Sequence, residues 1–372
     1  MTASALFSPL ALGPVPLPNR IVVAPMCQYS ADDGSATDWH LQHWMTLAMS
    51  GAALVVLEAT GVERRGRITH GCLGLYSDAN ERAMARGLAA ARGVALPGTR
   101  FGIQLGHAGR KASSQRPWEG GRALGPTEDP WLTVGPSALP FAEGWHTPEA
   151  LDDSGLERVT AAFVDAARRA VRLGFDAIEL HMAHGYLLHS FLSPLSNRRD
   201  DRWGGDAERR RAFPLAVARA VRDAVPEGIA LGVRVSASEW VDGGFGVGEA
   251  AVLASELKAL GFDFICASSG GNASHARIPV APGYQVPFAR EIRAKSGLVT
   301  RAVGLIVDAQ QAEDIIARGD ADQVALARAV LDDPRWGWHA AEALGAELTL
   351  PPQYRRVATA VWPGRKLLDA AE

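Results

Sequence analysis

The feature of this sequence that most constrains its fold is an eightfold alternation of short apolar runs with segments of helical periodicity. The apolar runs are rich in aliphatic and β-branched residues, and their lengths suit strands. The expected strands are 20–26, 52–59, 100–106, 175–181, 229–236, 262–268, 298–305 and 322–327. The expected helices are 38–50, 80–95, 154–173, 206–224, 247–260, 287–296, 308–318 and 332–345. Because unbroken apolar runs indicate parallel strands buried on both faces, the pattern predicts an α/β fold, the closed (β/α)8 TIM barrel.

Residues at the helix ends support these assignments. Ser154 and Glu157 have capping-box spacing at the start of one helix. Gly174, Gly261 and Gly319 stand where three helices should stop and can adopt the left-handed conformation needed there. The rival architecture is an open doubly wound sheet, but no G-x-G-x-x-G follows the first strand and eight units suit closure.

The chain is longer than a minimal barrel. It has 372 residues, whereas roughly 250 are typical of this architecture, so we expect a single domain with long loops. The connections after the third and fourth strands, about 107–153 and 182–205, are too long for simple connections and suggest lids or substrate walls.

Composition excludes several classes of function. A net charge of −3 gives no bias toward nucleic acid, so a small-molecule ligand is expected. No uncharged apolar run reaches about 18 residues, and prolines interrupt an N-terminus without a basic segment, which argues against a membrane span and a signal peptide. The three cysteines have no C-x-x-C spacing, so neither a disulfide framework nor a cysteine-ligated cluster is expected. We therefore expect a cytoplasmic protein.

The segment HMAHGY places His181, His184 and Tyr186 at the end of the fourth strand, where a barrel forms its active site. One buried histidine is commonly explained by packing, but three side chains that can carry protons at one strand end are harder to explain that way. His-x-x-His spacing also suits zinc, with His189 as a weak third ligand, so a metal-dependent hydrolase is an alternative.

Arg234 stands inside the apolar fifth strand, in the segment VRVS. A guanidinium cannot shed its charge, so it needs an anionic or strongly polar partner such as a carboxylate, a phosphate or an electron-rich cofactor. A buried ion pair with Glu58 or Glu179 is the alternative.

Other polar residues at strand ends have alternative explanations. Cys27 follows the first strand, where a free cysteine is often just a small buried apolar residue. Gln104 and His107, at the end of the third strand, could be hydrogen-bonding caps of the following loop.

Gly304 and Arg328 lie at the ends of the seventh and eighth strands, where barrels often bind a phosphate. With Arg234 and Gln104 nearer the centre, they suggest an elongated phosphate-bearing cofactor across the barrel mouth. Flavin mononucleotide (FMN) fits this description.

Several segments together resemble the old yellow enzyme family of flavin-dependent ene-reductases, over about residues 5–356. They are APMCQYSADDG, TDWHLQHW, QLGHAGRKA, HMAHGYLLHSFLSPLSNRRDDRWGG, VRVS and PPQYRR. The cysteine in PMCQYS resembles the thermophilic-like subclass. The resemblance implies noncovalently bound FMN and a ping-pong cycle, in which NADPH, or alternatively NADH, reduces the flavin and flavin N5 delivers hydride to the β-carbon of an activated alkene.

The resemblance also implies roles for individual residues. His181 and His184 would bind the substrate oxygen, Tyr186 would donate the proton, Tyr29 would be a second phenol facing the substrate, and Cys27 would tune the flavin potential. Residues expected to contact the flavin and its phosphate are Pro25, Met26, Cys27, Ala59, Gln104, Arg234, Gly304, Ala327 and Arg328.

The C-terminal residues raise a hypothesis about quaternary structure. Arg356 matches the arginine that this subclass inserts into a neighbouring subunit's site, which implies a homodimer or homotetramer. The tail 357–372 could present Trp362 as an aromatic wall of the partner's site, as in relatives resembling xenobiotic reductases, or could simply be a frayed end.

Two other classes of barrel protein are alternatives to an ene-reductase, and each lacks support in the sequence. Larger flavin dehydrogenases and dienoyl reductases share the barrel but carry an iron–sulfur cluster, which three unclustered cysteines do not suit. A non-catalytic binding barrel would not need Tyr186 beside the histidine pair.

Overall fold

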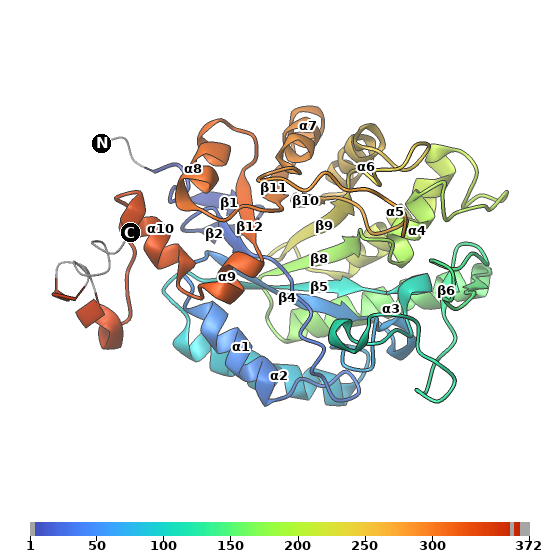
Figure 1. The fold of residues 1–372 in the computed structure, drawn as a ribbon, viewed down its shortest axis with the longest axis horizontal. Helices are drawn as coiled ribbons and strands as arrows, with labels where there is room; N and C mark the ends of the chain where they lie inside the picture. Colours follow the sequence, from blue (N-terminus) through green and yellow to red (C-terminus); the bar gives the residue numbers. More distant parts are fainter. Residues whose placement is uncertain (1–3, 358–360, 365–372) are drawn as a thin grey trace.

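Eight parallel strands close into a barrel with the helices arranged around it (Figure 1). The computed structural model describes residues 4–357 and 361–364. The barrel strands are β3 (Ile21–Val23), β4 (Leu54–Gly61), β5 (Arg100–Gly106), β8 (Ala177–Met182), β9 (Ala230–Ser236), β10 (Phe264–Ser268), β11 (Val299–Val303) and β12 (Gln323–Leu326). They pair in chain order, and β12 pairs with β3 to complete the circle. The predicted TIM barrel and its eight strands are confirmed.

Each predicted helix is present, with bounds that differ by a few residues. The helices are α1 (Asp38–Ala48), α2 (Asp78–Val94), α3 (Asp153–Arg172), α5 (Ala207–Ala224), α6 (Val247–Ala259), α7 (Val286–Ser296), α8 (Ala309–Ala317) and α10 (Trp336–Ala343). The short helices α4 (Leu187–Leu192) and α9 (Arg328–Asp332) follow β8 and β12. Gly174, Gly261 and Gly319 have φ values of 76°, 82° and 71°, which confirms the three predicted left-handed helix ends.

The capping box predicted at the start of α3 is wrong. Asp152 is the N-cap, and its carboxylate accepts a hydrogen bond from the Gly155 backbone N–H at 2.8 Å. The Ser154 hydroxyl donates to the same carboxylate at 2.9 Å. An ionised carboxylate at the first turn also interacts favourably with the helix dipole, so it outcompetes the serine two residues later.

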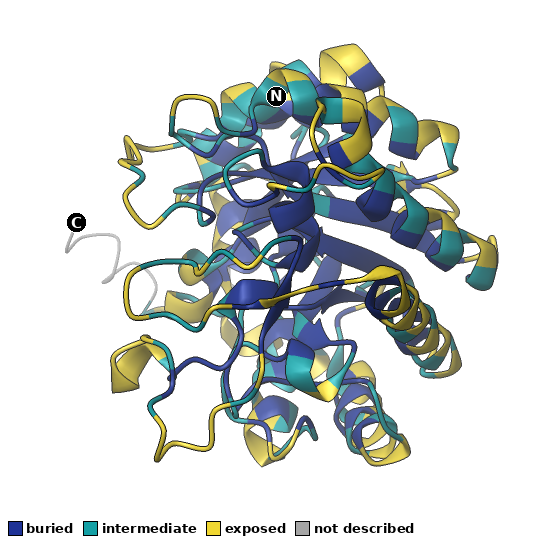
Figure 2. Cartoon of the chain, turned by 90° about the vertical axis from the view of Figure 1, so that its right-hand side faces the viewer, coloured by how far each residue is buried: buried dark blue, intermediate teal, exposed yellow. Residues whose placement is uncertain are grey.

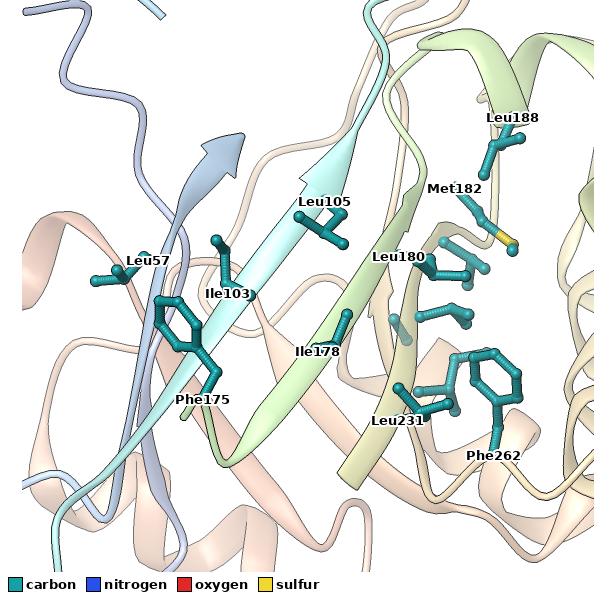
Figure 3. Close-up of a cluster of buried hydrophobic side chains, with 14 of the residues drawn as sticks. Leu57, Ile103, Leu105, Phe175, Ile178, Leu180, Met182, Leu188, Leu231 and Phe262 are labelled. Atoms are coloured by element: carbon teal, nitrogen blue, oxygen red, sulfur yellow. The ribbon is translucent and has the colours of Figure 1, made fainter. Parts of the chain in front are cut away.

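Successive side chains along the barrel strands point alternately toward the surrounding helices and toward the barrel interior. Ile178, Leu180 and Met182 project from β8 toward the surrounding helices (Figure 3), whereas Glu179 and His181 alternate with them and face the barrel interior. The eight barrel strands are largely buried, and the exposed residues lie mainly on the outer faces of helices and in loops (Figure 2). The interior positions of the strands are therefore available for polar groups.

An N-terminal hairpin that the sequence did not predict packs against the start of the strands. Its strands are β1 (Leu10–Leu12) and β2 (Val15–Leu17), which pair antiparallel. The buried side chains of Leu12, Val15 and Leu17 form a cluster with residues that begin the barrel strands, among them Leu54 and Ala177. One end of the barrel is thus filled with apolar groups, and the opposite end, with the long loops, remains for a site.

The loops after β5 and β8 contain short elements of their own. The first includes η2 (Gly109–Lys111), η3 (Pro117–Glu119), β6 (Val134–Gly135) and β7 (Glu149–Ala150), and the second includes α4. Two further 3-10 turns are η1 (Arg64–Gly66) after β4 and η4 (Pro352–Val357) near the C-terminus. None of the helices formed by residues 4–357 and 361–364 has both the length and the apolar character needed to cross a membrane.

Candidate active site

The three ionisable side chains of HMAHGY form one cluster at the carboxyl end of β8. The rings of His181 and Tyr186 meet edge to face with centroids 4.8 Å apart, and those of His181 and His184 are 5.2 Å apart. His181 and Tyr186 also line a small hollow together with Ile68 and Cys72 of the loop after β4. The structure therefore brings together the residues singled out from the sequence.

Tight backbone packing shapes the turn that carries this cluster. His184 has a positive φ of 59°, and Gly185 has a φ of 76°. A Cβ on Gly185 would lie 2.4 Å from the carbonyl oxygen of Gly271, so only glycine fits at this position. Lys111 joins the two loops, because its ammonium donates to the carbonyls of His184 and Gly271 at 2.8 Å each. Burial lowers the pKa of Lys111 to about 8.

Hydrogen bonds determine which ring nitrogens of the two histidines can face a ligand. Nδ1 of His181 accepts from the Ala183 backbone N–H at 3.2 Å, so the proton of a neutral ring sits on Nε2. Nε2 of His184 lies 2.8 Å from the Ser268 hydroxyl. The backbone N–H of His184 donates to Ser236 Oγ at 3.0 Å. Burial, and then the positive charge of Arg234, hold both histidine pKa values well below 6.5. Both imidazoles are therefore neutral at neutral pH.

Tyr186 is half-buried beside the two histidines and remains a phenol. Burial raises its pKa well above 10, so it can donate a hydrogen bond or a proton at neutral pH. The Lys111 ammonium lies 5.2 Å from the centre of its ring.

A β-bulge positions the segment that carries Cys27. The register between β4 and β5 shifts at Glu58, and the Glu58 carboxylate accepts from the Gln28 backbone N–H at 2.8 Å. Nε2 of His40 lies 3.4 Å from the other carboxylate oxygen. Cys27 is half-buried, and burial followed by the nearby Cys72 raises its pKa well above 9, so it is a thiol at neutral pH. A thiol is a weak nucleophile, so Cys27 is not primed for nucleophilic attack at neutral pH.

Tyr29 has a strained backbone held by the loop after β5. Its φ is 51°, and its carbonyl accepts a hydrogen bond from Arg116 Nε at 3.0 Å. Its ring packs edge-on against Trp118 with centroids 5.8 Å apart, and Trp118 is 66% exposed. The long loop thus places a second aromatic group beside Tyr29, one that the sequence reasoning missed.

Arg234 does not make either of the ion pairs considered from the sequence. Glu179 pairs with Arg301 at 3.0 Å instead, and Glu58 is engaged by His40 and the Gln28 backbone. Within the described part of the chain, Nε of Arg234 is buried and has no hydrogen-bond partner. Leaving a buried cationic N–H unpaired is costly, so this side chain calls for an external polar ligand.

The other residues expected to contact a cofactor surround the same end of the barrel. Pro25 and Met26 directly follow β3, while Ala59 on β4 pairs in register with Gln104 on β5. Gln104 is buried, and its side-chain amide donates to Glu179 at 2.7 Å. It is therefore held by a carboxylate and does not cap a loop.

The ends of β11 and β12 form the part of the site expected to bind phosphate. Ala327 is the N-cap of α9, and Arg328, its first residue, is exposed with no ion pair to any described residue. Gly304 has a φ of 111°, and a Cβ there would lie 2.3 Å from the Gln285 side-chain nitrogen. Packing against Gln285 thus explains the glycine, whether or not its backbone also contacts a ligand.

His107 and His189 have structural partners. His107 accepts from the Gly109 backbone N–H at 3.0 Å through Nδ1 and lies 2.8 Å from Glu63 through Nε2, as expected of a loop cap. His189 accepts from the Gly185 backbone N–H at 2.8 Å, and its other nitrogen lies 3.2 Å from Glu239. Among residues 4–357 and 361–364 no three His, Cys, Asp or Glu side chains are grouped to hold a metal ion. The third ligand that a metal-dependent hydrolase would need is missing from this region.

Comparison with known proteins identifies the family. Residues 5–347 match the model of the NADH:flavin oxidoreductase / NADH oxidase family. The chain belongs to this family. It is the old yellow enzyme family, and the chain is accordingly an enzyme, an oxidoreductase.

Relatives in the old yellow enzyme family match over nearly the whole chain. An NADPH dehydrogenase of Geobacillus thermodenitrificans is 42% identical over 357 residues, which cover 95% of this chain and 98% of the relative. An NADPH dehydrogenase of Listeria innocua is 42% identical over 355 residues, covering 95% and 99%. The solved structure of morphinone reductase superposes with a TM-score of 0.76 at 27% identity and covers 95% of this chain and 93% of its own.

The C-terminal residues expected to reach a partner lie outside this cluster of side chains. Arg356 is exposed on η4, and Trp362 is 41% exposed. Tyr354 of η4 packs against Trp338 of α10 with ring centroids 5.8 Å apart, which fixes this segment to the barrel. Of the tail, residues 358–360 and 365–372 lie outside the described residues.

Proposed function

We propose that this enzyme is an FMN-dependent ene-reductase that acts on α,β-unsaturated carbonyl or nitro compounds. The observation that carries the proposal is the cluster of His181, His184 and Tyr186 at the barrel end that also holds the unpaired Nε of Arg234. NADPH dehydrogenase and morphinone reductase, the names of relatives of this chain, describe reductive chemistry of this kind.

The residues at the barrel mouth fit FMN bound without a covalent link. Bound FMN would accept hydride from NADPH, or from NADH, and return it to the β-carbon of the alkene. Arg234 would stabilise negative charge on the reduced ring, and Gln104 would hydrogen-bond its pyrimidine edge. Ala327, Arg328 and Gly304 would hold the phosphate at the start of α9. Pro25, Met26 and Ala59 would contact the ring.

The histidine pair suits an oxygen that gains negative charge. Hydride transfer to the β-carbon of an enone moves charge onto the carbonyl oxygen, and fixed N–H donors stabilise that charge more than they stabilise the ground state. His181 presents Nε2–H, and His184 presents Nδ1–H if Ser268 donates its proton to Nε2. Because both rings are neutral, they act as hydrogen-bond donors without protonating the substrate outright.

Tyr186 would supply the proton at the α-carbon. A phenol with a raised pKa gives up its proton only to a strong base such as an enolate, so the transfer would follow the arrival of hydride. Tyr29 would contact the substrate from the other side, and Cys27, as a thiol, would tune the flavin potential.

Replacing Ser268 by alanine tests the proton arrangement on His184. The Ser268 hydroxyl lies 2.8 Å from His184 Nε2 and 3.4 Å from Gln285 Oε1, so donation to the histidine is the shorter contact. Without this hydroxyl the proton of His184 is free to move to Nε2, and the site loses one donor toward the ligand oxygen. We expect a phenol ligand such as 4-hydroxybenzaldehyde to bind about fivefold more weakly, as measured by perturbation of the flavin spectrum. Ser269 is the matched control, because it bonds to Gln285 at 2.6 Å and makes no bond to His184. An equal loss of phenol affinity in Ser269→Ala would contradict a specific role of Ser268.

We propose that Arg356, with Trp362 behind it, completes the site of a second subunit in a homodimer or homotetramer. Both side chains are exposed and extend from the segment fixed by Tyr354. Arg356→Ala is expected to leave the oligomer size in light scattering unchanged and to raise the KM for the alkene. An unchanged KM in the oligomer would contradict this contribution.

The three free thiols fit a reducing compartment, and we propose the cytoplasm.

The proposed function is tested by coupling NADPH oxidation to an alkene. The purified enzyme with FMN, kept free of oxygen, should oxidise NADPH beyond one equivalent of flavin only when cyclohexenone or a nitroalkene is added. The saturated product should appear in equal amount. Continued oxidation without any alkene, or the absence of a saturated product, would reject the ene-reductase assignment.

A further inference from the structure

A layer of polar side chains crosses the barrel interior beneath the proposed flavin site. Gln104 on β5 donates to Oε1 of Glu179 on β8 at 2.7 Å, and Arg301 on β11 donates to Oε2 of the same carboxylate at 3.0 Å. Two nitrogens of Arg301 also donate to the Gln323 side-chain oxygen on β12, at 3.1 and 3.2 Å. All four side chains are at most 2% exposed. This chain of contacts links two opposite pairs of strands.

The carboxylate of Glu179 dictates how the Gln104 amide is turned. An ionised carboxylate only accepts hydrogen bonds, so the amide nitrogen of Gln104 must face Glu179. The carbonyl oxygen of Gln104 is then directed elsewhere, and it accepts no hydrogen bond from any described residue. A glutamine side chain can present either its N–H₂ donor or its carbonyl acceptor to a ligand. In this arrangement Gln104 presents the carbonyl acceptor.

Arg301 explains how Glu179 can stay ionised inside the barrel. A lone buried carboxyl group would take up a proton, and a protonated carboxyl group could donate to Gln104 and allow the amide to turn around. The guanidinium at 3.0 Å balances the charge of Glu179 and also stacks over the Phe264 ring at 4.5 Å. The pair adds no net charge to the interior.

We propose that Glu179, kept ionised by Arg301, is a positioning residue that fixes Gln104 as a hydrogen-bond acceptor for the imide N–H of the flavin ring. This inference rests on the proposed binding of FMN. The imide nitrogen N3 of the isoalloxazine carries a proton, so an acceptor recognises it, whereas a reversed amide would set two donors against each other. The ion pair acts on FMN only through Gln104.

The charge-neutral double substitution Glu179→Gln with Arg301→Gln tests this arrangement. It removes both charges together, so the net charge beneath the flavin does not change while the direction of the Gln104 amide is no longer imposed. We expect the dissociation constant of FMN, measured by fluorescence quenching on the apoprotein, to rise about tenfold. With 15N-labelled FMN, the N3–H proton should exchange with solvent faster than in the wild type.

A matched surface pair and a second background make the test specific. Glu81→Gln with Arg169→Gln breaks a 2.6 Å ion pair between α2 and α3 and is expected to change FMN affinity less than about twofold. In a Gln104→Met background, the Glu179/Arg301 substitution should weaken binding no further. The same tenfold loss in that background would show that the ion pair acts on FMN by another route and would overturn the proposal.

Wild-type protein provides a test that does not depend on the variants folding. Its bound FMN should show an N3–H proton that exchanges more slowly than in free FMN, and equally fast exchange would overturn the proposal. Wild-type protein that binds no FMN would contradict the proposed function as well. Wild-type protein that binds FMN, with unchanged affinity in the charge-neutral variant, would contradict the positioning role alone.

Discussion

Replacing Tyr186 by phenylalanine is expected to slow the reoxidation of the reduced enzyme by cyclohexenone at least about 100-fold. Reduction of the flavin by NADPH should stay within about twofold of the wild type. The reason is that only the alkene half-reaction needs a proton at carbon, and the phenol of Tyr186 is the group placed to give it. Anaerobic stopped-flow absorbance measures the two half-reactions separately.

Tyr76→Phe is the matched control, because it deletes the same atom elsewhere. The Tyr76 hydroxyl donates to the Asp33 carbonyl at 3.0 Å. Its loss should reduce stability by about 1 kcal/mol and leave both half-reactions unchanged. Equal slowing of both half-reactions in Tyr186→Phe would mean that Tyr186 shapes the site without donating the proton.

The substitution Gly185→Ala should have the largest effect on stability of those considered. The new Cβ would lie 2.4 Å from the Gly271 carbonyl oxygen and 2.7 Å from Asn272 Cα, at a φ of 76°. Both obstacles are backbone atoms, so the two loops must separate. We expect a loss of about 2 kcal/mol or more in the free energy of unfolding, measured by urea denaturation. Displacement of His184 and Tyr186 should also abolish tight phenol binding.

Two further glycines separate the causes of this effect. Gly243 has a φ of 72°, but no atom lies within 4 Å of an added Cβ, so Gly243→Ala reports backbone strain alone, about 1 kcal/mol. Gly228 has open space and no positive φ, so Gly228→Ala should be close to neutral. If Gly185→Ala costs no more than Gly243→Ala, the close approach to Gly271 does not constrain the turn.

The barrel could be predicted because its signal is repeated and local. Each barrel strand is largely buried on both faces, so it appears in the sequence as an apolar run, and three of the helices end at a glycine in the left-handed conformation. Details that depend on competition between neighbours could not be read in this way. At the start of α3 two adjacent residue types both suit a cap, and the carboxylate of Asp152 takes the position predicted for Ser154. The hairpin β1–β2 was missed because its strands have only three residues each.

The residues that form the site could be predicted from the sequence, whereas the hydrogen bonds that hold them in place could not. HMAHGY places three functional groups at one strand end, and the structure brings them into contact. Lys111 and Ser268 were missed because their roles depend on loops and strands far away in the sequence. Pairing across a barrel is set by which strands face each other, and the sequence of one strand does not report that.

Arg301 shows most clearly that the sequence does not reveal which buried charges pair with each other. It lies inside an apolar strand, as Arg234 does, so the signal of a charged residue in a strand was present at both positions. From the sequence, Glu179 was a candidate partner for Arg234, but it pairs with Arg301 instead. This choice leaves Nε of Arg234 without a hydrogen-bond partner among the described residues, and that difference separates a structural ion pair from a candidate cofactor contact.

The most direct test of the account is an anaerobic visible absorption spectrum of the purified protein, recorded alone, after NADPH and then after cyclohexenone. We expect a flavin spectrum that bleaches with NADPH and returns when the enone is added. A flavin that NADPH does not reduce, or that stays reduced in the presence of the enone, would contradict the proposed cycle. A protein that is colourless and does not take up FMN would contradict the cofactor assignment on which the cycle depends.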